Sequence, residues 1–128
     1  YLFPIEVHAD EERIQQVVTN LIVNSIKYGK KKGTTEVRFE DFDELTIKVH
    51  IADNGEGIAQ EHLPRLFERF YRVDKSGSRK DGGSGLGLSI AKHIIEAHQQ
   101  EIFVESKVDI GSQFSFTLDK ATYSVDQT

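Results

Sequence analysis

A polar stripe of Asn20, Asn24 and Lys27 recurs at one-turn spacing along an otherwise apolar segment of the chain. At about 100° per residue, these side chains lie roughly a quarter turn from the centre of the apolar face, so they would border a cleft. Mg²⁺ prefers oxygen ligands and keeps several waters and phosphate oxygens, so one neutral asparagine oxygen from the protein suffices. A lysine one turn later could reach a phosphate as a point charge. Two ordinary surface asparagines would give the same pattern.

A carboxylate and two glycines follow a predicted strand in the segment Asp53–Ile58, DNGEGI. An ionised Asp53 only accepts hydrogen bonds, which suits an exocyclic amine such as that of adenine. Gly55 and Gly57 permit positive φ angles and allow a flat ring to approach the backbone. The alternative is a plain Asp-Asn-Gly turn without a ligand.

The glycine-rich segment Gly83–Leu88, GSGLGL, opens a helical pattern. Unpaired N–H groups at a helix N-terminus bind phosphate oxygens, helped by the helix dipole. The segment is not a P-loop, which needs Lys-Ser/Thr after the last glycine, and it lacks the preceding strand of a dinucleotide-binding fingerprint. A flexible linker that ends at a helix start is the alternative.

Aromatic and basic residues alternate in the segment Phe67–Arg72, FERFYR. We expect Phe67 and Phe70 to pack into the core, while Arg69 or Arg72 reaches an outer phosphate. This basic stretch lies in a chain of net charge −5, which suits a polyanionic small ligand and argues against nucleic acid as the main partner. Together, the motifs predict a nucleotide cleft in which separate groups of residues bind magnesium, the base and the phosphates.

The composition indicates a single soluble domain. The chain has 128 residues, of which 38% are hydrophobic and 29% charged, and it contains no cysteine. No apolar run approaches the roughly 20 residues that cross a bilayer, and no signal peptide opens the chain, so we expect no membrane contact by this chain. The absence of cysteine excludes disulfides and permits a cytoplasmic location. The five histidines show no metal-ligand spacing, and we expect them to be structural or exposed.

The apolar periodicity predicts the elements that would position these motifs. Their order predicts a two-layer α/β (α+β) sandwich, in which a mixed, mostly antiparallel five-stranded sheet carries three helices on one face. We expect Asp10 to cap the first helix and Val73–Gly85 to form a mobile loop. The expected strands are Ile5–His8, Glu36–Glu40, Leu45–Ile51, one through Ile102 and Val104, and Phe114–Leu118; the expected helices are Asp10–Gly29, Leu63–Phe70 and Leu86–His98.

With these motifs in this order, the chain resembles the ATP-binding catalytic domain of bacterial sensor histidine kinases, a branch of the GHKL superfamily with the Bergerat ATP-binding fold. The N box of that family corresponds to Asn20–Tyr28, the G1 box to Asp53–Ile58, the F box to Phe67–Arg72 and the G2 box to Gly83–Leu88. Gly111–Phe116 resembles the final glycine and strand. The resemblance implies a catalytic domain over residues 1–118 and a C-terminal tail over residues 119–128.

The resemblance also implies a role for each matched position. Asn24 would ligate Mg²⁺ with support from Asn20, Asp53 would bind the adenine amine, and Arg72 would meet the γ-phosphate beneath a lid formed by the loop. The catalytic residues would be Asn24, Lys27 and Arg72. The implied contacts to ATP are Asn20, Asn24, Lys27, Tyr28, Asp53, Gly55, Gly57, Ile58, Arg69, Phe70, Arg72, Gly83, Gly85, Leu86, Gly87 and Leu88.

The residue type at the position of Asn20 distinguishes two branches of the superfamily. The ATPases place a glutamate base at this position, and an asparagine cannot take a proton from water. The resemblance therefore implies transfer of the γ-phosphoryl group to a histidine of a separate dimerisation domain, and then to a response regulator. We expect a monomeric fragment of a parent kinase anchored in the inner membrane. The alternatives are a regulatory nucleotide-binding module without transfer activity and a serine kinase of the superfamily that acts on a protein partner.

Two departures from the family pattern concern the backbone. Gln99-Gln100 stand where the family usually has a glycine after a helix, so we expect a strained or reshaped turn there. Asp109 replaces a glycine that is often found two residues before Gly111.

Overall fold

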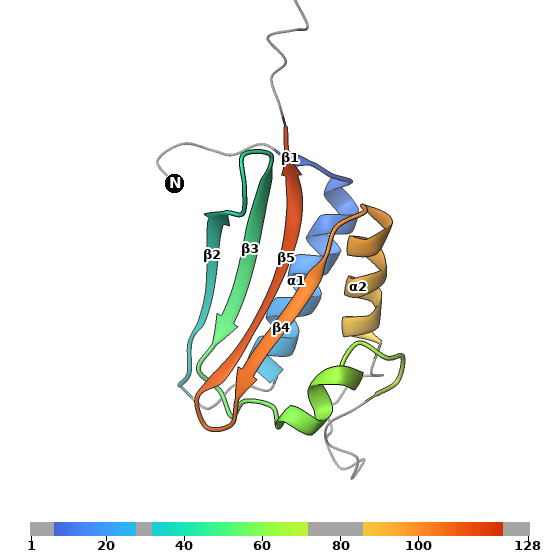
Figure 1. The fold of residues 1–128 in the computed structure, drawn as a ribbon. Coiled ribbons are helices and arrows are strands. Elements are labelled where there is room, and N and C mark those ends of the chain that lie inside the picture. The colour runs from blue at the N-terminus through green and yellow to red at the C-terminus, as the bar shows by residue number, and fades with distance from the viewer. Residues whose placement is uncertain (1–6, 28–31, 72–85, 122–128) are drawn as a thin grey trace, which may run out of the picture.

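The computed structural model describes residues 7–27, 32–71 and 86–121. A five-stranded sheet and two α-helices account for most of these residues (Figure 1). In chain order the elements are β1 (Val7–His8), α1 (Glu11–Lys27), β2 (Thr35–Asp41), β3 (Thr46–Asp53), the 3-10 helix η1 (Gln60–Arg65), α2 (Gly87–Ala97), β4 (Ile102–Lys107) and β5 (Gly111–Lys120).

The long strand β5 lies at the centre of the sheet. It pairs with β3 along one edge and with both β4 and β1 along the other, and β2 extends the sheet beyond β3. Every pairing among the described residues is antiparallel, so the sheet is more regular than the mixed arrangement we expected. β5 continues through Lys120, so the boundary expected after Leu118 falls inside a strand.

Both α-helices cover the same face of the sheet and pack against each other (Figure 1). Alternate residues of β3 and β5 point into the layer between sheet and helices, because successive strand residues face opposite sides. This confirms the predicted two-layer architecture, with its core on one side of the sheet. The fully buried apolar core consists of Val17, Leu21, Ile47, Val49, Ile51, Leu66, Ala91, Ile94, Ile95, Phe114, Phe116 and Leu118.

The ends of the helices follow from local chemistry. Asp10 caps α1 as predicted, because its Oδ1 accepts a bond of 3.1 Å from the N–H of Arg13. α2 ends at Ala97, and Gln99 just beyond it adopts φ 61°. The N–H groups of Gln99 and Gln100 donate to the carbonyls of Glu96 and Ile95, respectively. This is a Schellman arrangement with a glutamine in the left-handed position, as the missing glycine led us to expect. The described helices include none that is long and apolar enough to span a bilayer.

The helix that we predicted over Leu63–Phe70 is wrong. The structure has the shorter 3-10 helix η1 instead, with Pro64 inside it, and the chain then continues in turns. A proline ring prevents a backbone N–H bond at this point, and short 3-10 segments tolerate that loss better than a long α-helix. The predicted loop Val73–Gly85 lies outside the described residues.

Candidate functional site

A row of polar side chains crosses the sheet where its apolar core ends. The strand register places Thr35 opposite Asp53, Asp53 opposite Ser112, and Ser112 opposite Ser106. These four residues of β2, β3, β5 and β4 lie on the helix-covered face, two positions beyond the core residues Ile51 and Phe114. We call them the polar row. The register thus places Thr35 and Ser112 beside the carboxylate that the sequence singled out, and Ser106 one strand further away.

Asp53 is held by three donors from different parts of the chain. Its Oδ1 accepts from the N–H of Gly55 at 2.9 Å and, more weakly, from the N–H of Ser112 at 3.4 Å. Its Oδ2 accepts from the hydroxyl of Ser25 at 3.3 Å. A carboxylate offers about four acceptor positions, so one position on Oδ2 has no donor within the part of the chain that the structure describes. The half-buried carboxylate is therefore fixed and ready to accept one more hydrogen bond.

The turn after Asp53 is clamped against the β4–β5 hairpin. Gly57 adopts φ +76°, as expected for one of the two glycines, and Gly55 is buried while it donates to Asp53. The N–H of Ile58 donates to the hydroxyl of Ser106 at 2.7 Å, and the N–H of Asp109 donates to the carbonyl of Glu56 at 2.7 Å. These bonds fix the path of the turn relative to the sheet.

Gly111 brings the start of β5 against the backbone of Asp53. A Cβ atom at this position would lie 2.0 Å from the carbonyl oxygen of Asp53, and the φ angle is +143°. Only a glycine allows this approach without displacing backbone. The closing glycine of the family pattern therefore supports the same carboxylate that the sequence placed in the site.

Asn20 connects the first helix to the start of the second. Its Nδ2 donates to the carbonyl oxygen of Gly87 at 3.2 Å, so the predicted N box and G2 box meet in space although 67 residues separate them. Asn24 and Lys27 are half-buried on the same helix. α2 begins at Gly87 with Leu86 as its N-cap, and no side chain caps that helix end. Its first N–H groups thus have the character of an anion-binding helix terminus.

Other predicted contacts have mainly packing roles. Ile58 and Leu88 are half-buried against the hydrophobic core. Phe67 packs edge-to-face on Phe114 with 6.1 Å between ring centroids, which confirms its predicted core position. For Phe70 the prediction of core packing is wrong, because its side chain is 61% exposed and its φ is 65°.

The described arginines of the basic segment lie on the surface. Arg69 is exposed, with its guanidinium 5.7 Å from the ring centroid of Phe70. The guanidinium of Arg65 donates hydrogen bonds to the carboxylate of Glu68, and these bonds, together with the negative charge of Glu68, raise the pKa of Arg65 above its ordinary value. The predicted contacts Tyr28, Arg72, Gly83 and Gly85 lie outside the described residues.

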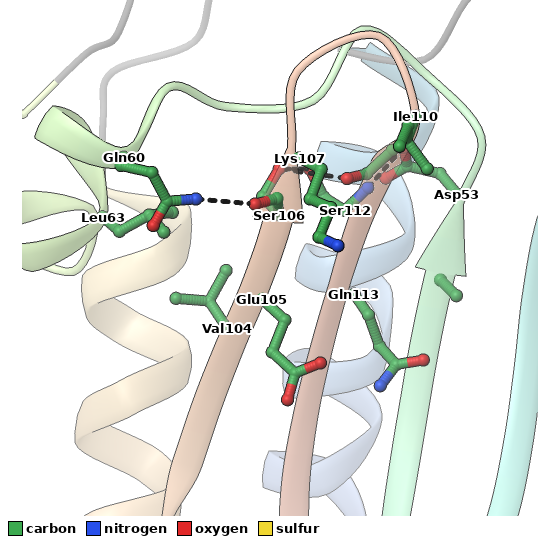
Figure 2. Close-up of a pocket in the computed structure, with 12 residues that line it drawn as sticks. Asp53, Gln60, Leu63, Val104, Glu105, Ser106, Lys107, Ile110, Ser112 and Gln113 are labelled. Carbon is green, nitrogen blue, oxygen red and sulfur yellow. Dashed lines mark hydrogen bonds between the residues drawn. The ribbon is translucent and has the colours of Figure 1, made fainter.

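A separate cavity of about 530 Å³ opens beside Asp53, at the end of β3, β4 and β5 (Figure 2). Its wall includes Gln60, which donates to the carbonyl of Ser106, and the side chains of Glu105 and Gln113. Among the predicted site residues that the structure describes, only Asp53 contributes to this wall. The cavity therefore shares only Asp53 with the described part of the nucleotide cleft that the motifs predict.

Sequence reasoning did not assign a role to Ser25, Thr35, Ser106 or Ser112. Ser25 falls on the apolar face of the α1 pattern, where a buried serine is a signal that a polar partner must exist. Ser25 is 1% exposed and contacts Thr35 and Asp53. The other three become visible only once the strand register is known.

Comparisons with known proteins agree with this geometry. Residues 9–122 match the family described as "Histidine kinase-, DNA gyrase B-, and HSP90-like ATPase". The phosphate regulon sensor protein PhoR of Haemophilus influenzae is 41% identical over 116 residues, which are 91% of this chain and 27% of that protein. The chain thus spans much less than half of this curated relative.

Solved structures show the same fold. Full-length ShkA in complex with AMPPNP matches with a TM-score of 0.80 and 28% identity, over 93% of this chain and 24% of that chain. The catalytic domain of the histidine kinase ThkA matches with a TM-score of 0.73 and 32% identity, over 89% of this chain and 70% of that chain. The chain therefore belongs to the histidine kinase-, DNA gyrase B- and HSP90-like ATPase family, and it corresponds to the ATP-binding catalytic domain of sensor histidine kinases.

Proposed function

We propose that this domain binds Mg-ATP and transfers the γ-phosphoryl group to a histidine on a separate dimerisation and phosphoacceptor domain. The observation that carries the proposal is the geometry of Asp53, which is fixed by three donors and keeps one acceptor position for the 6-amino group of adenine. A response regulator would then take the phosphoryl group from that histidine. The related structure of ShkA was solved with AMPPNP, which supports an adenine nucleotide as ligand.

In this proposal Asn24 is the protein ligand to Mg²⁺. No group of three or more His, Cys, Asp or Glu side chains in the described ranges could hold a metal ion by itself. One amide oxygen from α1 is compatible with magnesium that is bound mainly by phosphate oxygens and waters. When bound, the ion would neutralise charge on the phosphates.

The phosphate end of the site would combine several positive groups. Lys27 would contact the phosphates as a point charge, and Arg72 would meet the γ-phosphate, with Arg69 in a supporting role. The start of α2 and the preceding glycines would supply N–H groups. Catalysis would then rest on positioning and charge neutralisation, the means that phosphoryl transfer requires of a protein.

Asn20 supports transfer rather than hydrolysis. Its amide donates to the carbonyl of Gly87, and an amide has no basic site that could activate a water molecule. A kinase needs the γ-phosphate to survive until the acceptor arrives. We further propose that the domain is monomeric by itself, makes no membrane contact and works in the cytoplasm, while its parent kinase is anchored in the inner membrane.

Calorimetry with ATP, ADP and GTP, with and without Mg²⁺, tests the binding step. We expect adenine-selective binding that Asp53→Asn weakens at least tenfold, because the amide turns one acceptor into a donor that faces the adenine amine. Asp119→Asn, which removes an exposed carboxylate on β5, is the matched control and should bind like wild type. Equal affinity of wild type for ATP and GTP would contradict the adenine assignment.

Phosphoryl transfer needs its own assay. We expect radiolabel from γ-labelled ATP to appear on an added phosphoacceptor domain from a similar kinase, and Asn24→Ala to abolish the transfer while the domain stays folded. Normal transfer by Asn24→Ala would refute the magnesium assignment. Binding of ATP without any transfer to the parent kinase's own acceptor histidine would instead favour a regulatory nucleotide-binding module.

A further inference from the structure

One buried and one half-buried hydroxyl group lie beside the proposed base-binding carboxylate. Ser25 on α1 is 1% exposed, and its Oγ lies 2.8 Å from Oγ1 of Thr35 and 3.3 Å from Oδ2 of Asp53. Thr35 is the first residue of β2 and lies directly opposite Asp53 in the strand register. A helix and two strands thus bring three oxygen-bearing side chains together at one point.

The available protons set the direction of these hydrogen bonds. An ionised Asp53 has no proton to give, so the hydroxyl of Ser25 donates to Oδ2. A serine has only one hydroxyl proton, so its contact with Thr35 requires Thr35 to be the donor. The result is a chain in which Thr35 donates to Ser25, and Ser25 donates to Asp53.

We infer that Ser25 and Thr35 are positioning residues that give the site its selectivity for a 6-aminopurine. This inference rests on the proposed function, in which Asp53 accepts a hydrogen bond from the base. The N–H groups of Gly55 and Ser112 bind Oδ1, and Ser25 occupies one acceptor position of Oδ2. A single acceptor position is then left in a fixed direction, which favours an amine and repels a carbonyl such as O6 of guanine.

Loss of the Ser25 hydroxyl would leave two open acceptor positions on Oδ2 and one restraint fewer on the carboxylate. Oδ2 could then bind a water molecule or turn away from the base. ATP would bind more weakly, while a nucleotide without the 6-amino group would be little affected, because it gains nothing from Asp53. A purely structural role of the two hydroxyls predicts a change in stability with an unchanged preference between the two nucleotides.

Varying both the protein and the nucleotide distinguishes a positioning role of the two hydroxyl groups from a purely structural role. ATP and purine riboside triphosphate, which lacks only the 6-amino group, are titrated into the full chain by calorimetry. We expect wild type to prefer ATP by about tenfold and Ser25→Ala to prefer it by only about twofold, as the weakening of one hydrogen bond allows. Thr35→Val, which keeps the shape but removes the hydroxyl, should also lower the preference, while Thr35→Ser should keep it.

Each outcome bears on a different statement. If wild type shows no preference for ATP over purine riboside triphosphate, both the adenine assignment and this inference are wrong. A preference that is present in wild type and unchanged in Ser25→Ala and Thr35→Val overturns the inference alone and leaves the proposed function standing. Circular dichroism and thermal melts show whether each variant is folded, and the Thr35 pair decides the matter if Ser25→Ala does not fold.

Discussion

His50 and Ser115 form a buried hydrogen bond on the face of the sheet that carries no helix. The Nδ1 of His50 lies 2.6 Å from the Oγ of Ser115, and its Nε2 contacts the carboxylate of Glu40. His50 is only 3% exposed, because side chains of the neighbouring strands cover it. The outer face of the sheet thus has a small polar core of its own, separate from the nucleotide site.

Replacing His50 by Leu should therefore destabilise the fold without affecting the nucleotide. The substitution leaves the buried hydroxyl of Ser115 without its partner, which costs about 1–3 kcal/mol of unfolding free energy. Urea denaturation measures this loss, and ATP titration should give the wild-type affinity. His93→Leu, on the exposed side of α2, is the matched control, with an expected change within about 0.5 kcal/mol. Equal stability of both variants would show that the His50 pair contributes nothing.

Gly57→Ala should be strongly destabilising. A Cβ atom at Gly57 would lie 2.0 Å from the carbonyl oxygen of Lys107, and the φ of +76° already disfavours a side chain. Because the obstacle is backbone, the turn or the hairpin must move, and we expect a loss of about 3 kcal/mol or more together with weaker ATP binding.

Gly87→Ala is the control for stability, since a Cβ there meets nothing within 4 Å. This position lies in the first turn of α2, where alanine favours the helix by up to about 1 kcal/mol. Thermal melts of both variants check the contrast. A Gly57→Ala protein as stable as Gly87→Ala would mean that the turn is free to rearrange.

Gln99→Gly should stabilise the domain. Gln99 follows the C-cap of α2 and adopts the left-handed conformation at φ 61°, which costs a non-glycine residue roughly 1 kcal/mol. Glycine removes this strain but gains freedom in the unfolded chain, so we expect a net increase of about 0.5 kcal/mol, seen as a higher urea midpoint. The same change at Glu96, inside the helix and exposed, should destabilise by about 1 kcal/mol. A lower urea midpoint for Gln99→Gly than for wild type would show that the backbone of Gln99 is not strained.

Asn20→Asp should weaken the contact between the two α-helices in a pH-dependent way. The carboxylate would place an acceptor against the carbonyl oxygen of Gly87, where the wild-type amide donates. We expect a loss of about 1–2 kcal/mol at neutral pH. A protonated aspartic acid can donate the bond, so the folded state favours protonation and the loss should shrink as the pH falls.

Thr19→Asp controls for the added charge, since the neighbouring side chain is exposed on the same helix. Chemical denaturation at neutral and mildly acidic pH compares the two variants. A pH dependence shared by both would trace the effect to helix electrostatics rather than to Gly87.

Periodicity predicted the large elements of this fold because each buries one continuous apolar face. The pattern of α1 and α2 located both helices to within a few residues, and the alternation of Ile47, Val49 and Ile51 located β3. Periodicity gave a wrong prediction over Leu63–Phe70. The apolar spacing of this segment fits an α-helix, but Pro64 and the positive φ of Phe70 disfavour one. Local backbone geometry decided that segment, and hydrophobicity does not encode it.

The candidate site was only partly predictable for a different reason. Asp53, Gly57 and Asn20 belong to short motifs with visible spacing, and the structure gives each of them a specific contact. Thr35 and Ser112 come near Asp53 only through the strand register, which spacing along the chain does not reveal. For the same reason the alternation pattern could place His50 on the outer face but not show that neighbouring strands bury it.

The central place of β5 has a consequence for the synthesis of the protein in the cell. β1, β3 and β4 all pair with this strand, yet residues 111–120 are among the last described residues to leave the ribosome. Until they emerge, the apolar faces of α1, α2 and β3 have no complete partner, and such exposed surfaces attract chaperones or aggregate. A nascent chain arrested before Gly111 should therefore be protease-sensitive, whereas one arrested with β5 fully outside the exit tunnel should resist digestion.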